Sequence, residues 1–324
     1  MTRQLPLLAL ILGALVATSV QASVSVDEWL LRMEHAEQTL DYRGTLVRAA
    51  GSSIEAMRIV HRVGPNGIEE RIFALDGAPR EVLRVGDRVH SLVPGKRAVV
   101  VDPPIATGLV RRAAIGRLTQ EQAVYRAELG GTERVAGRMA RIIELYPQDR
   151  YRYARRLWLD AQTGMLLRSL VFEPDGEAVE KLSFVDIELG ARIEDVELAS
   201  VLDGQHLRTS EFVDPLAGAA AYRRPSWLPE ALPRGFRLVS VGAVAGDAEH
   251  LLFSDGLASV SIYIESGRNQ PAGEQLEARG ATHIYTGNQG GRMVTVVGEV
   301  PAATVSLIGQ NLRPAPASAV ASPR

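Results

Sequence analysis

Most of the chain consists of short segments rich in β-branched and aromatic residues, and turn signals separate these segments. Pro65-Asn66-Gly67, Asp76-Gly77 and Pro174-Asp175-Gly176 are three such turns. Strands are expected at Gly44–Arg48, Ala56–Arg62, Glu69–Leu75, Glu81–Val85, Val89–Leu92, Ala98–Val101, Thr132–Val135, Arg138–Leu145, Tyr153–Asp160, Leu166–Phe172 and Glu177–Ile187. Because tight turns join so many short strands, we expect a long antiparallel meander curved into a barrel or half-barrel.

Three helices are expected beside these strands. Ser25-Val26-Asp27-Glu28 is a capping box, and the apolar residues after it recur at helical spacing, which predicts a helix from about Val26 to Leu40. A second helix, at about Thr119–Leu129, is expected to interrupt the meander. Pro301 suits the first position of a third helix that runs to about Leu312.

A second, smaller group of strands follows a break in the pattern. From Phe212 to Pro229 the chain is rich in proline, glycine and alanine, which is typical of a linker. Strands are expected beyond it at Phe236–Val241, Glu249–Phe253, Ala258–Glu265, His283–Thr286 and Arg292–Gly298. The fold class is therefore α+β, mainly antiparallel β, with a large half-barrel domain at residues 23–211, a linker at 212–226, a small α+β domain at 227–313 and a disordered tail at 314–324.

The N-terminus has the features of a secretory signal peptide. Arg3 precedes a 16-residue apolar run from Leu5 to Val20, and Val20-Gln21-Ala22 places small residues where signal peptidase cleaves. The run is shorter than the ~20 residues that span a bilayer, which favours cleavage after Ala22 over a membrane anchor. With no cysteine in the chain, an exported protein of this size suits a bacterial periplasm, where a large core replaces disulfides.

Composition and motifs argue against most kinds of chemistry. The net charge of −2 offers no basic field for nucleic acid. The absence of cysteine excludes thiolate metal sites, and the six histidines are too scattered for a metal-binding helix. No nucleophile elbow, phosphate loop or dinucleotide fingerprint occurs. We therefore expect neither catalytic residues nor a metal or cofactor.

Two groups of residues are candidates for binding. In an extended strand Arg150, Arg152 and Arg156 share one face, where three guanidinium groups could hold an anionic ligand or an acidic partner. A solvated face neutralised by neighbouring carboxylates is the alternative. Trp227, Phe236 and Tyr263 are the aromatic candidates for a partner site, against the alternative of ordinary core packing. Because Trp227 follows a proline-rich linker, we expect it to anchor a site between the two domains.

Several segments resemble the MucB/RseB family of periplasmic sigma-E regulators. The segments are Trp29-Leu30, Tyr42–Val47, Trp158-Leu159-Asp160 with Thr163-Gly164-Met165, Trp227-Leu228-Pro229 with Pro233–Phe236, Asp255–Ala258, Val260–Glu265 and Met293–Pro301. The resemblance covers both domains in the expected order. It implies an unclosed barrel like that of periplasmic lipoprotein carriers, packed against a small domain.

The same resemblance implies a function and partners. Members bind the periplasmic domain of a transmembrane anti-sigma factor and protect it from regulated proteolysis until lipids, lipopolysaccharide or mislocalised lipoproteins displace them. We therefore expect a non-enzymatic negative regulator of the envelope stress response. A periplasmic lipoprotein or lipid carrier, or an envelope hydrolase, is the alternative. The stretch Val93–Arg126 shows no family pattern, and a homo-oligomer is left open.

Overall fold

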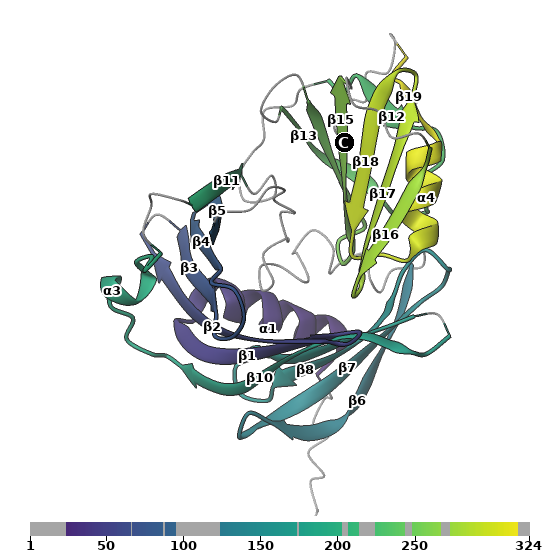
Figure 1. Cartoon of the computed structure of the whole chain (residues 1–324). Coiled ribbons are helices and arrows are strands. Elements are labelled where there is room, and N and C mark those ends of the chain that lie inside the picture. Colours follow the sequence, from purple (N-terminus) through teal and green to yellow (C-terminus); the bar gives the residue numbers. More distant parts are fainter. Residues whose placement is uncertain are drawn as a thin grey trace, which may run out of the picture.

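A computed structural model describes the protein at residues 24–65, 67–86, 88–94, 124–173, 175–202, 207–213, 224–243, 248–266 and 273–316. Two antiparallel sheets make up most of it (Figure 1). The signal peptide, the expected strand Ala98–Val101 and linker residues 214–223 lie outside the described residues. Their assignments stay predictions.

Among the described residues the large sheet has eleven strands and is open, because no pairing there joins its two edge strands, β11 and β6. Its order is β11-β5-β4-β3-β2-β1-β10-β9-β8-β7-β6. The strands are β1 (Tyr42–Ala50), β2 (Ser53–Gly64), β3 (Gly67–Ala74), β4 (Glu81–Val85), β5 (Arg88–Pro94), β6 (Tyr125–Val135), β7 (Arg138–Pro147), β8 (Ala154–Asp160), β9 (Leu166–Phe172), β10 (Ala178–Leu189) and β11 (Leu207–Val213). The unclosed, mainly antiparallel architecture expected from the sequence is confirmed.

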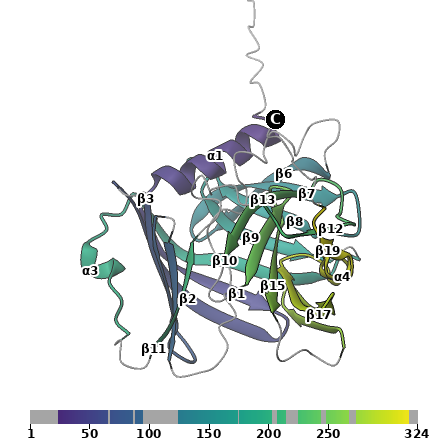
Figure 2. The ribbon, with the colours of Figure 1, turned by 90° about the horizontal axis from the view of Figure 1, so that it is seen from above.

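The helix α1 (Val26–Thr39) lies along one side of the curved sheet (Figure 2). Its N-cap is Ser25, whose side chain accepts the backbone N–H of Glu28, as the capping box predicts. Leu30 and Met33 are buried among Leu157 and other residues of β6, β7 and β8. We call the face of the large sheet that packs against α1 the inner face.

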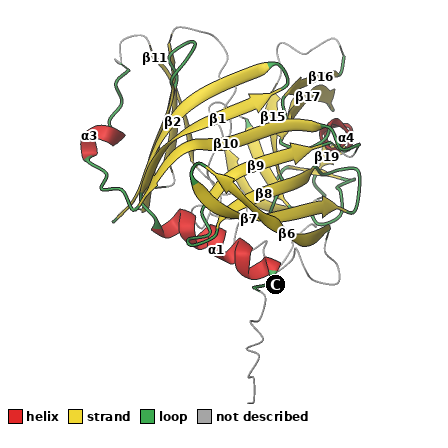
Figure 3. Ribbon diagram, turned by 90° about the horizontal axis from the view of Figure 1, so that it is seen from below, coloured by secondary structure: helices red, strands yellow, loops and turns green. Residues whose placement is uncertain are grey.

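Alternation along the strands explains why this face is apolar. On β1 the buried residues are Tyr42, Gly44 and Leu46, and on β9 they are Leu167, Ser169 and Val171. Because side chains alternate between the faces of a sheet, these residues point to the same side as α1. The opposite face carries more charge. There the short helix α3 (Asp195–Leu198) contacts β2 and β3 (Figure 3).

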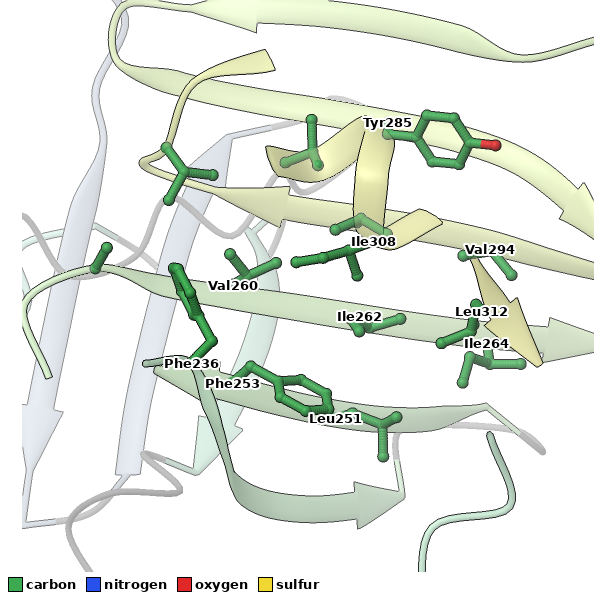
Figure 4. Packing of buried hydrophobic residues seen from close by; sticks show 14 residues of the cluster. Phe236, Leu251, Phe253, Val260, Ile262, Ile264, Tyr285, Val294, Ile308 and Leu312 are labelled. Carbon is green, nitrogen blue, oxygen red and sulfur yellow. The ribbon is translucent and has the colours of Figure 1, made fainter. Parts of the chain in front are cut away.

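The small sheet has six strands in the order β13-β14-β15-β18-β17-β16. They are β13 (Arg237–Ala243), β14 (Glu249–Ser254), β15 (Ser259–Ser266), β16 (Gln275–Arg279), β17 (Thr282–Gln289) and β18 (Arg292–Gly298). The helix α4 (Ala302–Gln310) packs on β17 and β18. Ile262, Tyr285, Val294 and Ile308 are buried in the core between helix and sheet (Figure 4). A separate pair, β12 (Trp227–Pro229) and β19 (Leu312–Pro314), packs against this core through Trp227, Leu228 and Leu312.

Most of the expected strands are present, and three other expectations were wrong. The helix at Thr119–Leu129 is instead strand β6 from Tyr125 onward, and its earlier residues lie outside the described part. Phe212 belongs to β11 rather than to a linker. Pro314, expected in a disordered tail, instead pairs with Trp227 in the β12–β19 ladder, and residues 317–324 lie outside the described part.

Candidate functional site

The two sheets meet at a seam of buried polar groups. We define the seam as the loop between β7 and β8, together with β8, where they contact the β14–β15 turn, the start of β17 and the N-terminus of α4. At its centre the Arg152 guanidinium donates to the Asp255 carboxylate, and neither side chain is exposed to solvent. Arg152 also donates to the Asp149 carboxylate and to the Arg234 carbonyl oxygen.

Asp255 uses both carboxylate oxygens. Its Oδ1 accepts the backbone N–H groups of Leu257 at 2.9 Å and Ala258 at 2.8 Å, which closes the β14–β15 turn. Its Oδ2 accepts Arg152 Nε and the Tyr125 hydroxyl, the latter at 3.3 Å. A buried charge is tolerated only when it is paired and hydrogen-bonded, so this carboxylate meets that condition.

Burial and the neighbouring charges together set the protonation of Arg152 and Tyr125. Burial lowers the pKa of Arg152, but the Asp255 carboxylate, together with Tyr125 and Asp149, raises it, and the net shift is upward. Burial and then the charge of Asp255 raise the pKa of Tyr125 well above its usual value. The phenol and guanidinium therefore stay protonated, and both donate to one carboxylate.

A second set of contacts continues the seam along β8. The buried Arg155 guanidinium forms an ion pair of 2.8 Å with Glu299, the residue after β18. The Tyr153 hydroxyl lies 3.1 Å from Nδ1 of His283 in β17. Thr304, at the start of α4, donates its hydroxyl to the Tyr151 carbonyl oxygen at 2.7 Å. Polar contacts from three small-sheet elements thus converge on residues 151–155.

The β16–β17 turn makes a third contact on the inner face. Gly280 has a positive φ of 59°, and a Cβ atom there would lie 2.7 Å from the Ala50 side chain, so the turn needs glycine. Ala281 is fully buried with Tyr153 and Val171. Its backbone N–H donates to Glu180, which is paired with Arg48 at 2.8 Å.

A pocket lies between α1 and the inner face. Its enclosed cavity is about 40 Å³, and the hollow reaches about 550 Å³ only when the space open to solvent is counted. Its lining is mostly apolar: Met33, Glu37, Tyr42, Leu46, Met165, Leu166, Leu167, Arg168, Ser169, Leu182 and Phe184. Small-molecule sites are typically concave and mostly apolar, with a few polar groups that orient the ligand. The arrangement suits an apolar chain with one polar end.

A buried polar pair supports one wall of this pocket. The Tyr42 ring stacks on His61 with their centroids 4.5 Å apart. His61 Nδ1 lies 3.0 Å from a Glu70 carboxylate oxygen, and its Nε2 lies 3.1 Å from the Glu37 carbonyl oxygen. Burial, and then the charge of Glu70, raise the pKa of Tyr42 well above its usual value. The contact fixes the C-terminal turn of α1 against β2.

The structure separates the three candidate arginines. Residues 150–153 form a loop before β8, so the shared strand face that we expected is wrong for Arg150 and Arg152. Arg150 is exposed, with its guanidinium 5.4 Å from the Tyr151 ring, and Arg156 pairs with Glu144 at 2.6 Å. Arg152 is buried in the seam and is not accessible to an external ligand.

The aromatic candidates also lie apart. Trp227 is in β12 and packs against the core of the small sheet, with Gly290 beside its ring. Its ring packs on its own domain and is only partly buried, so its expected position between the domains is not seen, and its role in partner binding stays a prediction. Phe236 is buried in that core, and the Arg152 guanidinium lies 4.9 Å from its ring. Tyr263 is partly exposed on the opposite face and stacks on His250.

Sequence reasoning missed the residue at the centre of the seam. Asp255 and Glu299 were named only as parts of family segments. A lone aspartate before a glycine is an ordinary turn signal, and nothing else marked Asp255. No local feature shows that its carboxylate reaches an arginine 103 positions earlier. The nearest signal was the dense run Arg150–Arg156, which is unusually basic for a segment entering a buried strand.

Neither a metal centre nor a membrane helix is found among the described residues. Within them, no three histidine or acidic side chains are grouped closely enough to hold a metal ion. The helices in the described ranges are also too short or too polar to cross a bilayer.

Comparison with known proteins identifies the family. The family model for the MucB/RseB N-terminal domain matches residues 25–202, and that for the MucB/RseB C-terminal domain matches residues 222–313. The chain belongs to the MucB/RseB family. It is 32% identical over 317 residues to the sigma factor AlgU regulatory protein MucB of Pseudomonas aeruginosa, covering 95% of this chain and 96% of that protein. The sigma-E factor regulatory protein RseB of Escherichia coli K12 is 23% identical over 94% of this chain and 96% of its own length.

Solved structures agree with this assignment. MucB in the complex structure of Pseudomonas aeruginosa MucA/MucB has a TM-score of 0.68 and 29% identity, and the match covers 90% of this chain and 99% of that chain. A crystal structure of MucB in complex with MucA(peri) gives a TM-score of 0.67 at 29% identity, covering 90% and 100%. The resemblance noted in the sequence is confirmed: this is a member of a MucB/RseB family of sigma factor regulatory proteins.

Proposed function

We propose that this MucB/RseB family member is a non-enzymatic, periplasmic negative regulator of an envelope stress response. It binds the periplasmic domain of a transmembrane anti-sigma factor and protects that domain from regulated proteolysis. The observation that carries the proposal is similarity over both domains to a MucB whose structure was determined with MucA. The signal-peptide features at the N-terminus support the location.

The seam supports this function by holding the two domains in one arrangement. A partner that contacts both domains gains affinity when they are already oriented, because less conformational freedom is lost on binding. Tyr263, on the face of the small sheet opposite α4, and the exposed or partly exposed Arg150 and Arg156 are candidate residues still accessible to a partner. Arg152 and Phe236 contribute by holding the seam, and Trp227 by holding β12 in place.

We also propose that an acyl chain, carried by a lipid or a lipoprotein, occupies the pocket beneath α1 and acts as the release signal. Met33, Leu167 and Phe184 supply apolar contacts, while Glu37 and Ser169 provide polar groups in the lining. Burial of each methylene contributes about 0.8 kcal/mol, so a single chain is enough for measurable binding.

The proposal is tested with three purified components. The mature chain is titrated with the periplasmic fragment of the anti-sigma factor from the same genome, and the protease that starts regulated proteolysis is then added. We expect one-to-one binding and slower cleavage of the fragment. Lipopolysaccharide or an acylated peptide should restore cleavage, and the same peptide without its acyl group should not. Absence of binding, or unchanged cleavage, overturns the regulatory proposal.

The pocket also favours a second candidate, a lipid or lipoprotein carrier. A carrier binds the acylated peptide stoichiometrically and transfers it to acceptor vesicles, with no affinity for the anti-sigma fragment. The same components therefore discriminate between the two functions.

A further inference from the structure

The β14–β15 turn joins the small sheet to the interior of the large one. Its Asp255 is the carboxylate of the buried pair with Arg152. Two residues later Leu257, only 7% exposed, belongs to the same buried cluster as Trp29, Leu30 and Met33 of α1. One short turn therefore holds both an ionic contact with the β7–β8 loop and an apolar contact with the cluster around α1.

The helix α1 connects that turn to the pocket. Met33 belongs to the cluster that includes Leu257 and also lines the pocket. One helical turn later Glu37 lines the pocket, and its carbonyl oxygen is bonded to His61 of β2. Packed interiors do not deform continuously, so a displacement of Met33 is passed to its neighbours in the cluster.

We propose that the β14–β15 turn is a latch between the two domains, and that an acyl chain in the α1 pocket releases it through Met33 and Leu257. The inference rests on the proposed acyl ligand and adds the route by which occupancy changes the domain arrangement. Because coupling between two sites is reciprocal, a weakened latch must bind the acyl chain more tightly.

The chemistry of the buried pair suits a latch. Opposite charges buried together lose their hydration, and much of their attraction only compensates for that loss. When the turn withdraws, Arg152 and Asp255 are hydrated again, so the open state is accessible. When it is docked, the pair requires close geometry, which gives one defined closed state instead of a range of loosely packed ones.

The test measures the distance between the domains and the affinity for one probe, dodecanoate. The chain has no cysteine, so Val185→Cys in β10 and Glu277→Cys in β16, both at exposed positions, give two unique sites for spin labels. We expect one narrow distance distribution in the free protein. Dodecanoate should broaden it and lengthen the mean distance.

Two latch variants and one control complete the design. Leu257→Ala and Asp255→Asn should each broaden the distribution without ligand and tighten dodecanoate binding about fivefold or more. Asp255 is not part of the pocket lining, so its variant tests coupling without adding space for the ligand. Leu276→Ala, at a residue 52% exposed on β16, should change neither measurement. Leu257→Val serves if the alanine variant does not fold.

Each outcome decides between the proposals. Dodecanoate binding with unchanged distances, or unchanged dodecanoate affinity in both latch variants, overturns the latch and leaves the acyl pocket standing. Failure of dodecanoate to bind overturns the acyl pocket and the latch together. Binding of the anti-sigma fragment, measured separately, still decides the regulatory function.

Discussion

The substitution Asp255→Asn probes the seam with almost no change in shape. The amide can keep its oxygen on the backbone N–H groups of Leu257 and Ala258, which the native Oδ1 accepts. Its NH₂ group then faces the Tyr125 hydroxyl, which can rotate to accept, and Arg152 Nε, which can only donate. Arg152 is left as a buried cation without its fully buried partner.

The magnitude follows from what Arg152 loses and keeps. Removal of one partner from a buried ion pair costs about 3–5 kcal/mol. Arg152 keeps the Asp149 carboxylate, which is 27% exposed, and the Arg234 carbonyl oxygen. We therefore expect a loss near the lower limit, about 3 kcal/mol in the free energy of the first unfolding transition.

Urea denaturation followed by circular dichroism measures this loss. Asp175→Asn is the matched control, because Asp175 also accepts a backbone N–H, that of Glu177 at 3.2 Å, in an exposed turn. We expect the control to change the free energy of unfolding by less than about 1 kcal/mol. A loss below about 1 kcal/mol in Asp255→Asn would refute the view that this pair holds the seam.

Four further predictions concern other parts of the chain. Gly309→Ala places a Cβ atom 2.2 Å from the Tyr285 ring, so the free energy of unfolding should fall by about 1–3 kcal/mol in a urea titration. Burial lowers the pKa of His250 to about 4, so between pH 6.5 and 4 the unfolded chain binds the extra proton, and stability should fall by up to about 3 kcal/mol as the pH is lowered. His250→Phe should flatten that pH dependence. Limited proteolysis should cut first within residues 214–222, after β11, because the composition of this segment favours few ladder hydrogen bonds; a first cut within Thr132–Ile187 would contradict the domain boundary. Arg150→Gln with Arg156→Gln should weaken binding of an acidic partner at low salt and leave folding intact, whereas equal affinity at low and high salt in both proteins would exclude a role for these charges.

Strands with one buried and one exposed face were predictable, because alternation and turn signals both mark them. The bounds of β4, β9 and β18 agree with the expected ranges, and the capping box placed the start of α1 correctly. Strand β16 was missed because all five of its residues are exposed, so no alternation marks it. At β6 a helix was expected, although Tyr125, Ala127 and Leu129 alternate as in a strand.

The seam was beyond local sequence reasoning for a physical reason. Whether an arginine is exposed or buried depends on the acidic group it meets, and Arg152 meets Asp255 from a distant turn. The sequence predicted that the whole basic run is one strand. In the structure, residues 150–153 instead form a loop, and Arg152 is buried. The position of Trp227 depended in the same way on a distant segment, because β12 pairs with β19, 85 residues further along the chain.

One measurement tests the central claim most directly: cleavage of the anti-sigma factor's periplasmic fragment by its protease, with and without the mature protein. We expect a stoichiometric amount of the protein to slow cleavage strongly, and Asp255→Asn to weaken this protection without abolishing the fold of either domain. Equal cleavage rates with and without the protein, at concentrations where both are folded, would contradict the regulatory function.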